Sequence, residues 1–97
     1  MARLSVSVVS PEAEVFSGEA DMVVARGTAG MVGIMPGHAP MLIELAEAPV
    51  RLFDGMTERE SIQVSGGFLH VTPGDEVTRV DVLAEKAHLP EEGDDSA

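Results

Sequence analysis

Hydrophobic and polar residues alternate along much of this chain with a period of two residues. Within residues 3–9, aliphatic side chains take positions 4, 6 and 8, and polar side chains take positions 3, 5 and 7. The segment from Val77 to Leu83 repeats this pattern, with Val80 and Val82 set against Arg79 and Asp81. Such alternation is typical of a β-strand that buries one face.

Further short segments predict strands at 13–17, 19–26, 50–53, 61–64 and 68–71. Turn residues separate them, among them Pro11, Asp54-Gly55 and Pro73-Gly74-Asp75. Met41–Ala48 suits a helix by composition, but prolines at 40 and 49 enclose it and its shortness favours a strand. Two glycines at 66 and 67 interrupt a strand pattern and indicate a bulge or a close approach of two backbones. Many short strands with frequent turns predict an all-β sandwich or barrel.

The stretch from Gly27 to Pro40 is the densest in glycine and proline. Its sequence is G-T-A-G-M-V-G-I-M-P-G-H-A-P. Because glycine reaches backbone angles that other residues avoid and proline fixes its own, we expect a loop of defined shape here. Loops carried by a rigid scaffold are common sites of recognition.

The C-terminal segment changes character after Leu83. A-E-K-A-H could begin a helical turn, but Pro90 and the following E-E-G-D-D-S-A would not continue one. We therefore expect a sandwich domain over residues 1–87 and an acidic, disordered tail over 88–97.

Composition narrows the class of protein. The 97 residues suffice for one domain, and an aliphatic core is expected because three phenylalanines are the only aromatic residues. The absence of cysteine excludes disulfides, and no apolar run approaches the ~20 residues of a membrane span. A net charge of −11 argues against nucleic acid as a partner. It favours either a partner with positive charge or simple solubility.

Candidate catalytic chemistry is sparse. The histidines at 38, 70 and 88 have no metal-site spacing; His70 is expected at an exposed strand position, and His38 is either a turn residue or a partner contact. Ser10 and Ser65 lack a nucleophile motif, and the glycine stretch lacks the lysine of a phosphate-binding loop. These residues favour a binding or structural module with no catalytic site, metal or cofactor.

Five motifs together resemble the epsilon subunit of F-type ATP synthase, in its N-terminal domain. They are V-V-S-P-E at 8–12, F-S-G-E at 16–19, G-x-x-G-x-x-G-I-x-P-G-H-A-P-x-L at 27–42, V-S-G-G-F-L-x-V at 64–71 and V-x-V-L-A-E-x-A at 80–87. The resemblance implies a flattened β-sandwich of about ten strands. It also implies a non-catalytic rotor subunit of the central stalk that links the gamma subunit to the c-ring and couples proton flow to ATP synthesis.

The resemblance also implies roles for single residues. Gamma contacts are expected at His38, Ala39 and Pro40, with Ser10 close by. The c-ring contact is expected at the loop tip, which comprises Ala29, Gly30, Met31 and Val32. Backbone requirements, and no partner contacts, are expected at Gly33, Gly37, Gly66 and Gly67. The implied location is the cytoplasmic face of the bacterial plasma membrane, as a peripheral protein without membrane insertion.

Two departures from the family pattern matter. Met31 stands where relatives commonly carry an acidic residue. The sequence also contains no counterpart of the helical hairpin that follows the sandwich in most members, so nucleotide binding and inhibition by those helices are not expected. The alternative to a rotor subunit is a free-standing β-sandwich adaptor for another protein ligand.

Overall fold

The computed structural model describes residues 3–89 and contains only β-strands. Residues 90–97, which hold most of the predicted tail, lie outside the described part. The all-β fold class is confirmed. The eight strands are β1 (Arg3–Val9), β2 (Glu14–Ala20), β3 (Met22–Gly27), β4 (Gly30–Ile34), β5 (Met41–Glu44), β6 (Ala48–Asp54), β7 (Thr57–Thr72) and β8 (Val77–His88).

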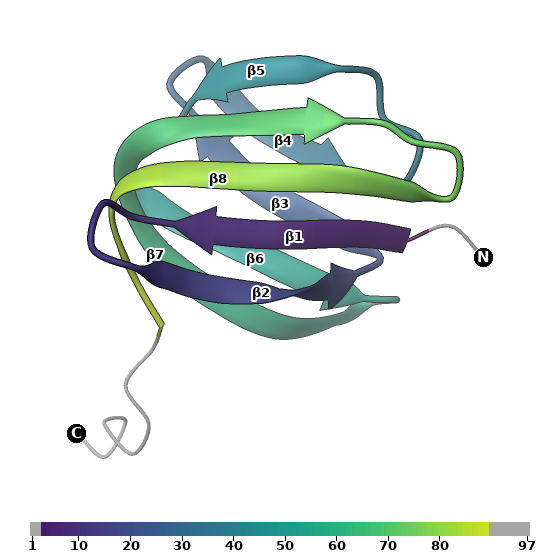
Figure 1. Ribbon diagram of the computed structural model, residues 1–97, viewed down its shortest axis with the longest axis horizontal. Helices are drawn as coiled ribbons and strands as arrows, with labels where there is room; N and C mark the ends of the chain where they lie inside the picture. Colours follow the sequence, from purple (N-terminus) through teal and green to yellow (C-terminus); the bar gives the residue numbers. More distant parts are fainter. Residues whose placement is uncertain (1–2, 90–97) are drawn as a thin grey trace.

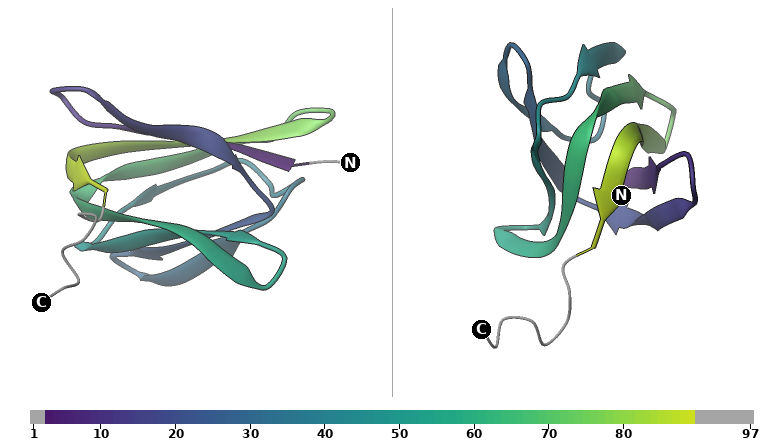
Figure 2. Two further views of the ribbon diagram at one scale, coloured as in Figure 1. Left: turned by 90° about the horizontal axis from the view of Figure 1, so that it is seen from below. Right: turned by 90° about the vertical axis from the view of Figure 1, so that its left-hand side faces the viewer.

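The strands form one continuous sheet that folds into two layers (Figures 1 and 2). Its order is β2-β1-β8-β7-β6-β3-β4, and β5 pairs with β7 beside this path. One layer contains β2, β1, β8 and β5, and the other contains β6, β3 and β4. All neighbours are antiparallel except β1 and β8, which run parallel from Arg3 opposite Val77 to Val9 opposite Leu83.

The 16-residue strand β7 belongs to both layers. Its first half pairs with β6 and its second half with β5, while β8 follows along its other edge. The two segments expected at 61–64 and 68–71 are therefore one strand that bends at Gly66 and Gly67. Counting the two halves of β7 separately gives nine strands within residues 3–89, where the resemblance implies about ten.

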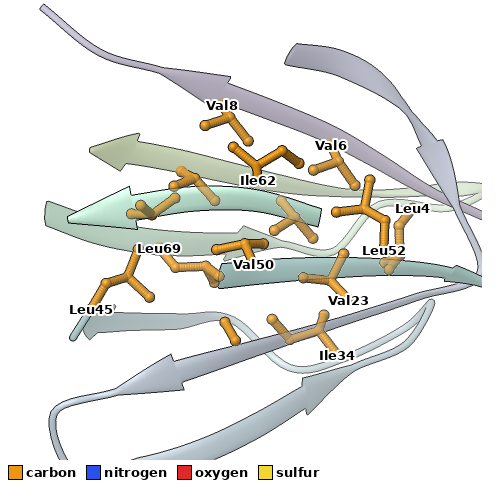
Figure 3. Close-up of a cluster of buried hydrophobic side chains, with 14 of the residues drawn as sticks. Leu4, Val6, Val8, Val23, Ile34, Leu45, Val50, Leu52, Ile62 and Leu69 are labelled. Carbon is orange, nitrogen blue, oxygen red and sulfur yellow. The ribbon is translucent and has the colours of Figure 1, made fainter. Parts of the chain in front are cut away.

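The core lies between the two layers and is aliphatic, as the composition predicts (Figure 3). Alternate residues of β1 and β8 enter it, including Leu4, Val6, Val80 and Val82. Leu52 and Ile62 reach it from the other layer. None of the three phenylalanines belongs to the buried cluster; Phe16 only packs against its margin.

The structure differs from the sequence expectation in three places. The stretch from Gly27 to Pro40 is not one loop, because Gly30–Ile34 pairs with β3 as β4. The segment expected as one strand over 19–26 is divided between β2 and β3 at Asp21. Ala84–His88 continues β8 instead of starting a helical turn, because it pairs with Gln63–Gly67 of the bent β7. The preference for a strand after Pro40 is confirmed by β5.

Candidate functional site

The outer face of the layer formed by β5, β7, β8 and β1 carries an exposed apolar patch. Phe68 and Leu83 lie directly opposite each other on β7 and β8 and are 48% and 56% exposed. Leu42 of β5 lies opposite His70, which follows Phe68 by two positions on β7 and therefore lies on the same face. Leu42 is also exposed. Large apolar side chains gathered on one sheet face are typical of a surface that binds another protein.

Ser10 lies at the border of this patch, in the turn between β1 and β2. Its backbone N–H donates to the carbonyl of Ala13 at 2.9 Å, and its hydroxyl lies 3.3 Å from Oε1 of Glu12. Ser10 is only 8% exposed. It lines a hollow together with Val9, Pro11, Phe68 and Leu83. The backbone of Ser10 thus holds the turn, while the neighbouring apolar side chains offer most of the contact surface.

His38 belongs to the loop between β4 and β5, which is anchored on the buried Thr78 of β8. The N–H of Gly37 donates to Oγ1 of Thr78 at 2.8 Å, and the N–H of His38 donates to the carbonyl of Met35 at 3.0 Å. The ring atom Nδ1 of His38 lies 2.8 Å from the carbonyl oxygen of Ala39, a contact in which the ring N–H donates. The ring is half-buried, and Ala39 and Pro40 are exposed.

The β3–β4 hairpin carries the predicted loop tip. Its turn residues, Thr28 and Ala29, connect Gly27 to Gly30, and the N–H of Thr28 donates to the carbonyl of Glu44 at 3.0 Å. Met31 is 59% exposed just beyond the turn. A hollow of about 390 Å³ lies beside the hairpin and is lined by Met31, Val32 and Ile43, among other residues.

The structure separates Ser10 from His38, which the family resemblance placed close together. Ser10 follows the C-terminal end of β1, which faces Leu83 of β8, whereas the His38 loop is anchored at Thr78, near the start of β8. Thr78 and Leu83 are five positions apart on β8, which corresponds to roughly 17 Å along the strand. Ser10 is therefore not close to His38; it lies beside Phe68 and Leu83.

The four predicted backbone glycines fall into two groups. Gly37, Gly66 and Gly67 have φ angles of 89°, 75° and 106°, in the region that favours glycine. A Cβ on Gly67 would also lie 2.1 Å from the carbonyl oxygen of Leu83. Gly33 departs from the expectation, because its φ is not positive and an added Cβ would meet no atom within 4 Å. Nothing inside the domain requires glycine at position 33.

Charged residues form ion pairs on the surface of the described domain. Arg3 contacts Asp54 at 3.2 Å and also reaches Glu19 and Asp21, while Arg59 contacts Asp54 at 3.0 Å. Over residues 3–89, no three histidine, aspartate or glutamate side chains are grouped so that they could hold a metal ion. The described chain also has no helix long and apolar enough to cross a membrane. His70 is exposed on β7, as predicted.

Sequence reasoning missed Leu42, Phe68 and Leu83 as surface residues. The signal was present, because Leu69 and Val82 point into the core and their direct neighbours must therefore point outward. Their clustering was not readable, since it depends on the pairing of β5, β7 and β8.

Comparison with known proteins finds relatives with the same fold and identifies the family. Residues 3–90 match the family described as the β-sandwich domain of the ATP synthase delta/epsilon chain. The ATP synthase epsilon chain of Brevibacillus brevis is 48% identical over 90 residues, which make up 93% of this chain and 65% of that protein. The epsilon chain of Thermobifida fusca is 45% identical over 94 residues, or 95% of this chain and 66% of that protein.

Solved structures share the architecture. A chain in the Euglena gracilis mitochondrial ATP synthase (OSCP/F1/c-ring) superimposes with a TM-score of 0.77 at 21% identity, covering 99% of this chain and 59% of that chain. A chain of the Tetrahymena thermophila mitochondrial ATP synthase central stalk and c-ring gives a TM-score of 0.63 at 15% identity, covering 94% and 75%. This chain spans a little under two thirds of the length of its epsilon-chain relatives. On the family match over residues 3–90, the chain belongs to the ATP synthase delta/epsilon chain β-sandwich domain family.

Proposed function

We propose that this chain is a non-catalytic rotor subunit in the central stalk of a bacterial F-type, proton-translocating ATP synthase. It binds gamma and the c-ring at the cytoplasmic face of the plasma membrane and helps to couple proton flow to ATP synthesis. Membership of the delta/epsilon family supports this proposal, as do the relatives named ATP synthase epsilon chain. Nucleotide binding is not part of this proposal.

The exposed apolar patch is the observation that carries the proposal. An acidic domain of this size gains nothing in solubility from Phe68, Leu83 and Leu42 on one outer face. Removal of such a face from water by a partner is favourable by roughly 25 cal/mol per Å² of apolar area. We therefore assign gamma binding to this patch and its border at Ser10. The His38–Pro40 loop is a second gamma contact, and the hairpin tip Ala29–Val32 contacts the c-ring.

Binding to gamma tests this assignment. The wild-type chain, mixed with the complex of alpha, beta and gamma subunits, is expected to elute with it in one-to-one stoichiometry with gamma. Phe68→Ser is expected to weaken this binding at least tenfold, because it removes an aromatic anchor from the centre of the patch. Binding is measured by titration with a fluorescently labelled chain.

Met56→Ser is the matched control, since Met56 is 98% exposed in the turn between β6 and β7 and lies outside the patch. This variant should bind as the wild type does. If the wild type forms no complex with gamma, the rotor function is wrong and the alternative hypothesis, an adaptor for another protein, is favoured. If Phe68→Ser binds normally, the function stands and the patch is the wrong surface.

A further inference from the structure

Strand β4 is the last strand at one end of the sheet, and its outer edge is unpaired within residues 3–89. In its pairing with β3, Gly27 and Gly30 flank the two-residue turn and form the first hydrogen-bonded pair. Hydrogen-bonded and non-hydrogen-bonded pairs alternate in an antiparallel ladder, so Met31 and Gly33 take non-hydrogen-bonded positions. Their N–H and C=O groups point away from β3, and no other segment within residues 3–89 pairs with them.

The edge strand at the opposite end of the sheet, β2, is protected against pairing with a further strand, and β4 is not. Strand β2 carries Glu14 and Glu19, has a register shift where it pairs with β1, and its Glu19 carbonyl accepts a hydrogen bond from Arg59. Charges and irregularities of this kind prevent further strand pairing. Strand β4, with the sequence G-M-V-G-I, contains no charge, no proline and no bulge. Its edge is therefore competent to receive another strand.

Gly33 gives a second, independent sign of a partner at this edge. Its backbone angle and its surroundings inside the domain both permit a side chain. Glycine in a strand is otherwise unfavourable, and it commonly marks a place where another backbone approaches closely. The open space lies over the sheet face at the edge strand and holds no atom of this domain, so a backbone that packs over Gly33 belongs to another chain.

The charge near the edge indicates what that chain carries. Arg26 of β3 lies directly opposite Met31, is exposed, and has no ion-pair partner within residues 3–89. Arg3, Arg51, Arg59 and Arg79 all contact carboxylates. A second copy of this chain is a poor partner for this edge. Its own β4, G-M-V-G-I, would bring no carboxylate to Arg26, and the copy would add a further net charge of −11.

We propose that β4 binds an extended segment of a partner polypeptide by strand addition, through the backbone groups of Met31 and Gly33. The segment has a small residue over Gly33 and an aspartate or glutamate within reach of Arg26. Backbone pairing supplies affinity in this mode, and the side chains supply specificity. The proposal extends the contact at the hairpin tip from side chains to backbone, and it rests on the proposed function for the identity of the assembly.

The probe is a bacterial ATP synthase complex stripped of its own epsilon chain. Gly33→Pro removes the outward N–H without touching a bond to β3 and is expected to weaken binding at least tenfold. Gly33→Ala keeps the N–H but adds a methyl group where the partner packs, so it should weaken binding less than Gly33→Pro does. Arg26→Gln should weaken binding several-fold, and Arg26→Lys should restore most of it. Hydrogen exchange of the Met31 and Gly33 amides should be fast in the free chain and slowed at least tenfold in the complex.

The outcomes separate the two proposals. If the wild type does not bind the complex, the rotor function and this inference both fail. If it binds but the two amides exchange at their free rates, only strand addition is overturned; the same holds if Gly33→Pro, shown to fold by its thermal unfolding, binds normally. The amide measurement on the wild type decides the matter even if Gly33→Pro does not fold.

Discussion

Residues of the same type have different structural roles in this domain because their surroundings differ. Gly67 and Gly33 are both strand glycines, yet only Gly67 combines a positive φ with a carbonyl oxygen in the space of a side chain. We predict that Gly67→Ala lowers the free energy of unfolding by about 2–3 kcal/mol, because the strained backbone angle costs 1–3 kcal/mol by itself. Urea unfolding followed by circular dichroism measures the change.

Gly33→Ala is the matched control for this prediction at the same scale. Its Cβ enters open space, and the unfolded chain loses conformational freedom, so stability should stay equal or rise by up to about 1 kcal/mol. Unchanged stability of Gly67→Ala would show that the bend at Gly67 does not need glycine. A loss of stability in Gly33→Ala would mean that Gly33 has a constraint inside the domain after all.

At the scale of elements, one hydrogen bond ties the β4–β5 loop to the parallel pair of β1 and β8. Gly37 donates it to Thr78, whose side chain is buried at the start of β8. Thr78→Val keeps the shape but leaves no acceptor, and we predict a loss of about 0.5–1.5 kcal/mol. The Gly37 amide should then exchange with solvent at least tenfold faster, which hydrogen exchange followed by nuclear magnetic resonance detects.

The control for this element is Thr72→Val, an exposed threonine at the end of β7. It should leave both the stability and the exchange of Gly37 unchanged. If Thr78→Val also leaves that amide slow, another group fixes the loop, and the position of His38 does not depend on β8.

At the scale of the whole molecule, like charges dominate. The chain has seventeen acidic and six basic residues, so repulsion among carboxylates outweighs the few surface ion pairs, each worth about 0–1 kcal/mol. We predict that raising sodium chloride from about 20 to about 300 mM raises the melting temperature by a few degrees, since salt screens repulsion between exposed charges. Differential scanning calorimetry measures this shift.

Asp54→Asn separates the local pairs from the global charge. It removes the contacts with Arg3 and Arg59, so it should destabilise the domain at low salt by up to about 1 kcal/mol, with a smaller difference at high salt. A melting temperature of the wild type that falls with salt would contradict the prediction and would make the ion pairs the larger contribution.

Local sequence patterns predicted most of the strands and the faces they bury, although β4 was expected as part of a loop. Alternation in residues 3–9 and 77–83 identified Leu4, Val80 and Val82 as core residues, because successive side chains of a strand point to opposite sides. It also located the turn at Asp54-Gly55, and it indicated a bulge or a close backbone approach at Gly66-Gly67, of which the close approach occurs at Gly67. These features are local, and the chemistry of a few neighbouring residues is enough to set them.

The surfaces that those strands create depend on which strands pair with each other in the folded domain. The apolar patch requires β7 beside β8, the neighbourhood of Ser10 and Phe68 requires β1 parallel to β8, and the open edge requires that β4 have no strand on its outer side. Pairing between distant segments depends on how all strands share one core, which no local pattern encodes. For the same reason Gly33 and Gly67 read alike in the sequence and differ in the fold.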